Sequence, residues 1–163
     1  MGRSWNDVTG DTLYLWGKQY RLEIMYDLIH QGVEMSGDRI IFMMQSFTTP
    51  DRQKRIVEQF YSAELDAKLK SVFPKAEKRT GISTKKYQVY RLGKAKYSVS
   101  DSGMIRINPS MAIQNALCLD LILVKALIET KEPSGTDRFY ELLDACFPEW
   151  REVEKLFLDE FNL

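Results

Sequence analysis

The side chains that usually carry enzyme chemistry are few in this chain of 163 residues. His30 is the only histidine, and no cysteine or second histidine stands at the spacing of a tetrahedral zinc site. The sequence also lacks a glycine-rich phosphate loop, a Gly-x-Ser-x-Gly turn and a His-Glu-x-x-His motif. We therefore expect His30 to be an exposed or structural residue, and no motif in the sequence names a reaction.

The other polar groups with chemical potential have a plain structural interpretation. Cys118 and Cys146 stand in apolar helical patterns, where a thiol behaves as a small apolar group. We expect both to be buried free thiols rather than a disulfide or a metal pair. Glu149 and Glu152 belong to a charged helical face, and we interpret them as solvated surface.

A looser set of carboxylates offers one alternative site. Carboxylate oxygens are the ligands that hard cations such as Mg²⁺ or Mn²⁺ prefer. Four acidic residues of the C-terminal half could gather around such an ion, although the sequence does not fix their geometry: Asp101, Glu129, Glu132 and Asp137.

A small basic cluster is the remaining candidate binding patch. Arg91, Lys94 and Lys96 lie close to Tyr90 and Tyr97, so they could contact a phosphate backbone or an acidic partner, or form a solvated turn, which we favour. Lys and Arg total 23, as do Asp and Glu, so the net charge is zero. Such a balance gives no reason to expect non-specific binding to nucleic acid or to a membrane surface.

The length and composition predict a single cytoplasmic domain spanning residues 1–163. Apolar residues make up 44% of the chain, which is enough to build a core. The polar segment 1–11 has no apolar signal core, and we expect it to be flexible. The longest apolar run, 116–128, contains Asp120 and Lys125 and is too short to cross a bilayer, so we expect no membrane association.

The hydrophobic pattern predicts an α+β fold. Alternating runs within 13–44 predict strands, arranged most simply as two hairpins in a meander. Thr49-Pro50 predicts the start of a long helix that reaches Pro74, with a second helical piece to Arg79. Strands within 86–108 include a hairpin at Asp101-Ser102-Gly103. Helices follow at about 112–130, 136–146 and 149–161, with Thr136 as an N-cap.

Several short segments of the sequence resemble the YgjP-like metallopeptidase family, whose members are small relatives of the SprT-like zincins. The resemblance covers residues 15–157. It begins at LWGKQYRLEI and continues in KYSVSDSGMIRINPS (96–110), which keeps Ser98, Ser100, Gly103, Ile105 and Asn108 of the family's hairpin. The stretch CLDLILVKALIETKEPSGTDRFYELLDACFPEW (118–150) then follows the family's zinc helix, loop and closing helix without a gap. The resemblance implies a zincin-like domain with N-terminal β-hairpins, a long helix, a β-hairpin and C-terminal helices.

The same resemblance implies that the zinc ligands and the catalytic base are missing. The family's first zinc histidine corresponds to Lys125, its catalytic glutamate to Ala126, its second histidine to Glu129 and its third to Gly135. In a His-Glu-x-x-His helix, two imidazoles one turn apart hold zinc and the glutamate takes a proton from the bound water. We expect no cofactor, and we expect Lys125 and Glu129 to pair along the helix at i, i+4.

These observations favour a catalytically inactive pseudo-metallopeptidase that binds a protein partner through the former peptidase groove around Lys125, Ala126, Glu129 and Gly135. A nucleic acid partner at the basic cluster has weaker support. Two alternatives stay open: an enzyme with a rebuilt carboxylate metal site, and a phage or mobile-element protein that blocks a host complex. The last predicted helix carries an apolar stripe, which packs on its own domain or joins two copies of the chain: Val153, Leu156, Phe157 and Phe161.

Overall fold

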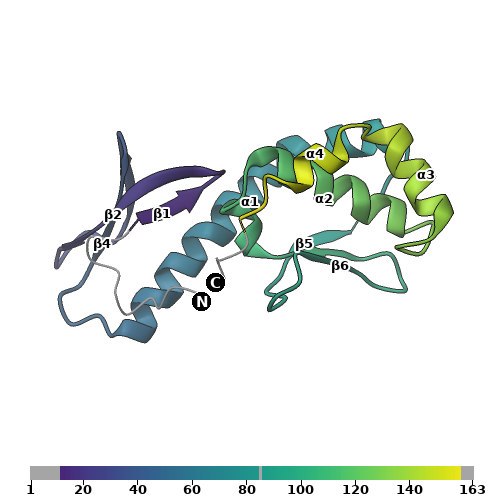
Figure 1. The fold of residues 1–163 in the computed structure, drawn as a ribbon. Helices are drawn as coiled ribbons and strands as arrows, with labels where there is room; N and C mark the ends of the chain where they lie inside the picture. Colours follow the sequence, from purple (N-terminus) through teal and green to yellow (C-terminus); the bar gives the residue numbers. More distant parts are fainter. Residues whose placement is uncertain (1–11, 85, 159–163) are drawn as a thin grey trace.

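Two small sheets joined by one long helix make up the α+β fold of the computed structural model, which describes residues 12–84 and 86–158 (Figure 1). The predicted fold class and order of elements are confirmed, and segment 1–11 lies outside the described residues. The elements are β1 (Thr12–Leu15), β2 (Lys18–Tyr26), β3 (Gly32–Ser36), β4 (Arg39–Met44), α1 (Pro50–Thr80), β5 (Tyr87–Val89), β6 (Tyr97–Val99), β7 (Ile105–Ile107), the 3-10 turn η2 (Pro109–Ala112), α2 (Ala116–Glu129), α3 (Asp137–Cys146) and α4 (Trp150–Glu154).

The N-terminal sheet is not the meander that the alternating pattern predicts. Its strand order is β1-β2-β4-β3, and β2 runs parallel to β4. The reason lies in β4, whose Ile40, Ile41 and Phe42 are all buried, as expected of a central strand covered by neighbours on both sides. The more polar β3 takes the edge instead, where unpaired backbone groups can meet water.

Helix α1 is continuous through Pro74, where the sequence predicts a break. Thr49 caps its start by accepting a hydrogen bond from the Arg52 amide, and the helix ends at Gly81, whose φ of +69° suits a residue without a Cβ. A proline inside a helix costs about 3 kcal/mol. Burial of Phe73 and Ala76 beside it offsets that cost.

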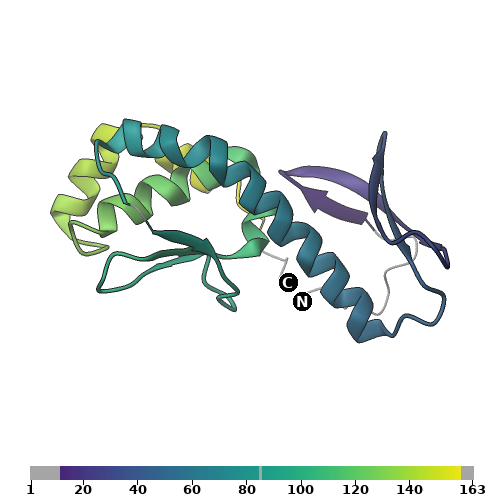
Figure 2. The same cartoon turned by 180° about the vertical axis from the view of Figure 1, so that it is seen from behind.

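The second sheet and helices α2 to α4 occupy the other end of α1 (Figures 1 and 2). The strand order is β5-β7-β6, with β5 parallel and β6 antiparallel to the central β7. The β6–β7 pair is the hairpin predicted at Asp101-Ser102-Gly103. Helix α2 is nearly all apolar and buried, and it packs against α1, α3, α4 and β6.

The last helix is shorter than predicted, because α4 ends at Glu154 rather than near residue 161. The backbone after α4 is held by the buried side chain of Gln114. The side-chain amide of Gln114 accepts a hydrogen bond from the backbone N–H of Leu158 (2.7 Å) and donates one to the backbone carbonyl of Leu158 (2.9 Å). Val153 is buried and Phe157 is half-buried, whereas Leu156 is exposed. The predicted stripe therefore packs partly on its own domain, and its Phe161 lies outside the described residues.

None of the described helices is both long and apolar enough to cross a membrane. The buried apolar side chains of the two sheets and the helices form one continuous cluster.

Gly17 provides a test of how the N-terminal sheet docks on the rest of the chain. It has a φ of +78°, and a Cβ there would lie 2.9 Å from the Asn115 Cα, while the Trp16 amide donates to the Ala112 carbonyl at 2.7 Å. Gly17→Ala should therefore lose about 1–2 kcal/mol through backbone strain and about 1–3 kcal/mol more through overpacking, measured by urea unfolding.

Gly37→Ala is the matched control, because Gly37 also has a positive φ (+61°) but has nothing within 4 Å of an added Cβ. It should show the strain alone. Equal losses for the two variants would mean that the close approach of Gly17 to Asn115 does not penalise an added methyl group.

Candidate functional site

Helix α2 presents two charged side chains from an otherwise apolar surface, on the face shared by β6 and α4. Lys125 and Glu129 are one turn apart, so they lie on the same side of the helix. Both are partly buried, and the side chain of Lys125 is only 19% exposed. A largely buried ammonium requires an opposite charge or other compensation nearby.

The ion-pair partner of Lys125 is Glu154 on α4, not Glu129 as predicted from the i, i+4 spacing. The ammonium also lies 5.7 Å from the centre of the Trp150 ring, within the range of a cation–π contact. The short helix α4 brings both partners to the outer face of α2. Because Glu154 is 29 positions away, the pattern within α2 alone could not reveal it.

Glu129 faces β6 instead, where its carboxylate interacts with the side chain of Tyr97. Burial and this neighbouring carboxylate raise the pKa of the Tyr97 phenol, while Ser134 acts in the opposite direction. A raised pKa keeps the phenol neutral, so Tyr97 remains a hydrogen-bond donor throughout the physiological pH range.

Aromatic rings line the side of the site formed by α3 and α4. The rings of Tyr140 and Trp150 are stacked with their centres 5.8 Å apart. Trp150 is fixed by a hydrogen bond from its indole nitrogen to Asp144 (2.8 Å), and the Arg151 guanidinium lies 4.3 Å from its ring centre. The site therefore combines a paired cation, a carboxylate and a rigid aromatic wall.

The other two predicted site positions, Ala126 and Gly135, carry no reactive group. Ala126 is fully buried within α2. Gly135 lies in the exposed loop before α3 with a φ of +84°, a conformation that side chains other than glycine rarely adopt. The predicted N-cap Thr136 then accepts a hydrogen bond from the Phe139 amide, which sets the start of α3.

The groups present at this site do not fit a zinc ion. Zinc ligands are thiolates, neutral imidazoles and carboxylates. Among the four predicted site positions, only Glu129 carries a side chain that could ligate zinc. Lys125 places an ammonium group one helical turn away from it. Across the described ranges 12–84 and 86–158, no group of three or more His, Cys, Asp or Glu side chains could hold a metal ion, so the alternative set of Asp101, Glu129, Glu132 and Asp137 is not brought together.

The basic cluster is partly occupied by contacts within the chain. Arg91 forms an ion pair with Glu58 of α1 at 3.3 Å, and the Lys96 ammonium lies 4.6 Å from the Phe157 ring centre. Lys94 is exposed in the turn between β5 and β6. Two of the three cations therefore already have partners in different parts of the fold.

The remaining polar candidates have the structural roles that the sequence predicts, except that Cys146 is not fully buried. His30 is exposed and contacts Asp27 at 3.2 Å, and Asp27 also accepts a hydrogen bond from the Ile29 amide at 2.8 Å. Both cysteines are free: Cys118 is fully buried, which raises the pKa of its thiol to about 11, and Cys146 is half-buried.

Sequence reasoning missed Glu154 and Tyr140 as members of the site, and it noted Tyr97 and Trp150 without assigning them to it. Trp150 is the last residue of the stretch 118–150 that resembles the family. Glu154 and Tyr140 carry no such signal, because their roles depend on the angle at which α3 and α4 cross α2.

Comparison with known proteins identifies the family of this chain. The family model of the YgjP-like metallopeptidase domain matches residues 3–159, and the chain therefore belongs to the YgjP-like family. No curated protein and no solved structure matches it. The resemblance to this family seen in short segments of the sequence is confirmed.

The pairing of Lys125 with Glu154 is open to a direct energetic test. A double-mutant cycle with Lys125→Met and Glu154→Gln, followed by urea unfolding, should give a coupling energy of about 1 kcal/mol, since one partner is largely buried. The exposed pair Lys155–Glu152 is the matched control and should give about 0.3 kcal/mol. Equal coupling in the two cycles would contradict a stabilising role for the Lys125 pair.

Proposed function

We propose that this member of the YgjP-like family acts as a pseudo-metallopeptidase that binds an extended segment of a protein partner without hydrolysing it. The segment would lie along the face of α2 that carries Lys125 and Glu129, which we call the pseudo-peptidase groove. The observation that carries the proposal is the ion pair of Lys125 with Glu154, at the position where the family resemblance expects the first zinc histidine. A protonated, paired lysine repels a metal cation and cannot coordinate one.

The chemistry of the neighbouring positions supports the same conclusion. Ala126 has no group that could take a proton from a water molecule, and Gly135 has no side chain to act as a third ligand. Glu129 is engaged with the Tyr97 phenol. The apolar frame around these positions, by contrast, is kept: Leu127 is fully buried and Trp150 is packed in the aromatic wall.

The outer edge of β6 supplies a surface on which an extended chain can bind. The Asn108 amide donates to the Lys96 carbonyl and the Ser100 amide to the Met104 carbonyl, so even-numbered residues of this strand face β7. The backbone groups of Tyr97 and Val99 therefore point to the other side, where no described residue pairs with them. An added strand would form backbone hydrogen bonds there, next to Glu129 and Lys125.

A protein segment fits this groove better than a nucleic acid. The chain has no net charge, and Arg91 and Lys96 already make contacts within it. Strand addition requires only backbone groups, with side-chain selectivity supplied by the rings of Trp150 and Tyr140 and by the charges of the site.

Metal analysis tests the absence of a zinc site. The purified chain should carry no stoichiometric zinc, and a peptidase assay with added Zn²⁺ should show no turnover. The variant K125H/E129H removes the ion pair between Lys125 and Glu154 and introduces two imidazoles one turn apart. It should gain zinc binding that a chelator reverses. The single variant E129H is the control and should bind far more weakly. One zinc per wild-type chain would overturn the proposal.

Partner capture tests the groove. A tagged chain should retain a specific partner from native lysate, and the partner should be lost with K125M/E129Q and with Val99→Pro. Val99→Pro removes an outward-facing amide that β7 does not use, so it should block an added strand while leaving the fold intact, as circular dichroism would verify. Capture that survives both changes would place the binding surface elsewhere.

A further inference from the structure

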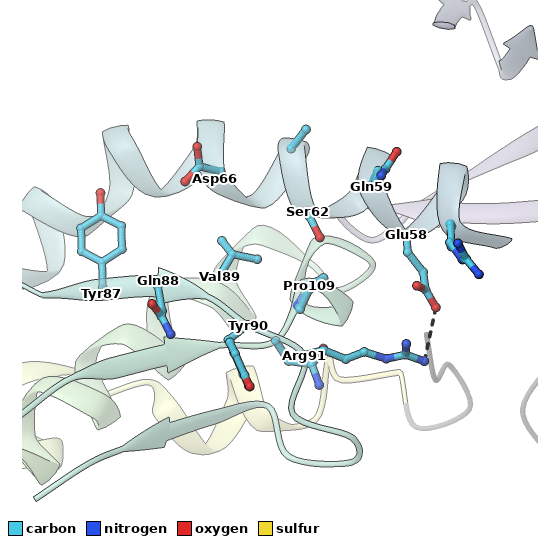
Figure 3. A pocket seen from close by; sticks show the side chains of 13 residues that line it. Glu58, Gln59, Ser62, Asp66, Tyr87, Gln88, Val89, Tyr90, Arg91 and Pro109 are labelled. Atoms are coloured by element: carbon cyan, nitrogen blue, oxygen red, sulfur yellow. Dashed lines mark ion pairs between the residues drawn. The ribbon is translucent and has the colours of Figure 1, made fainter. Parts of the chain in front are cut away.

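A separate cleft lies on the opposite edge of the second sheet, between α1 and β5 (Figure 3). Its volume is about 650 Å³, which is within the range of ligand-binding clefts. One wall is a stripe of α1, and the other is β5, from which the side chains of Tyr87 and Val89 point toward the helix (Figure 3). The cleft shares no lining residue with the groove around Lys125 and Glu129.

The backbone of β5 presents free hydrogen-bonding groups at this edge. The Ile105 amide donates to the Lys86 carbonyl and the Tyr90 amide to the Ile107 carbonyl, so even-numbered residues of this strand face β7. Successive backbone groups of a strand alternate in direction, so those of Tyr87 and Val89 point away from β7. Within 12–84 and 86–158, no residue pairs with them, and an unpaired strand edge is a template for another strand.

The wall provided by α1 matches the dimensions of an extended chain. Arg55, Gln59, Ser62 and Asp66 are spaced so that they lie on one face of the helix, and the small Ser62 stands at its middle. The stripe is about 16 Å long at the helical rise per residue. That length accommodates about five residues of a strand.

The charges of the cleft indicate the kind of segment that fits. Two arginines, Arg55 and Arg91, are balanced by Glu58 and Asp66. Glu58 forms an ion pair with Arg91 (dashed line in Figure 3), with its Oε1 3.3 Å from the guanidinium, yet this oxygen is buried and accepts no well-aligned hydrogen bond. A buried carboxylate oxygen in this state favours a ligand that brings a hydrogen-bond donor, such as a backbone amide.

We propose that the α1–β5 cleft is a second binding groove, which takes up an extended polypeptide segment of low net charge as an added strand on β5. The free amides and carbonyls of Tyr87 and Val89 form the ladder, and the polar stripe of α1 contacts the side chains of the segment on one face. This groove is independent of the proposed pseudo-peptidase groove, because the two lie on opposite edges of the same sheet.

The test selects phage-displayed random linear peptides on the full-length chain and measures the affinity of the synthetic winners by fluorescence anisotropy. Some of the selected peptides should lose affinity by at least about tenfold with Val89→Pro. The substitution removes the outward-pointing amide of residue 89 and with it the hydrogen bond that this amide would donate to the bound peptide. Ser62→Trp, which fills the middle of the cleft from an α1 position, should have a similar effect. Val99→Pro on the other edge of the sheet should leave these peptides unaffected.

Amide hydrogen exchange gives a readout specific to strand addition. In the free chain the amides of Gln88 and Tyr90 should be protected by β7 and those of Tyr87 and Val89 should exchange quickly. Bound peptide should slow the exchange of Tyr87 and Val89.

Failure to select any peptide sensitive to Ser62→Trp or Val89→Pro would overturn the proposal, as would bound peptide that leaves the Tyr87 and Val89 amides in fast exchange. If the Val89→Pro variant does not fold, the proposal is tested by the affinity of the peptides for Ser62→Trp and by the hydrogen exchange of the unmodified chain. Peptides lost only with Val99→Pro would count against this cleft and for the groove beside α2.

Discussion

One apolar stripe along α1 packs against both halves of this protein. Most of its buried residues recur every three or four positions along a helix of 31 residues, and they run from Val57, beside the N-terminal sheet, to Ala76 near the other end of the helix. Tyr61 adds a directional contact, since its hydroxyl donates to the Tyr14 carbonyl at 2.7 Å. Farther along the helix, Phe73 stacks on Tyr87 of β5 with ring centres 4.2 Å apart. These contacts to both sheets come from the part of α1 that precedes Pro74.

Much of this architecture could be predicted from the sequence, because the relevant signals are local. Thr49, which precedes Pro50, and Thr136 are N-caps, and their side chains accept the hydrogen bonds expected of caps. Topology was harder: alternation in β2 and β3 predicts strands but not which strands pair, and the burial of Ile41 on the second face of β4 was the available signal for a central position. The end of α4 could not be predicted either, because it depends on the distant side chain of Gln114.

The candidate site shows the same division between local and distant information. The positions Lys125, Ala126, Glu129 and Gly135 follow from the family resemblance, since the frame around them aligns without a gap. Their contacts do not follow, because charges on one helix face can pair along the helix or across to a neighbour. Here the crossing helix is close enough for Glu154 to reach Lys125, and β6 is close enough for Tyr97 to reach Glu129. Helix spacing alone favours the wrong partner.

Among the described residues, no further strand pairs with either edge of the second sheet, and this bears on how copies of the chain could associate. A strand edge on each side of one sheet allows copies of a chain to pair head to tail, a contact that does not close on itself and that can grow into fibres. In this protein β5 and β6 are only three residues long, so each edge offers the backbone groups of two residues. Such short ladders cannot hold two folded copies together unless side chains add to the contact. The brevity of β5 and β6 therefore limits the backbone pairing that either edge offers to a second copy of the chain.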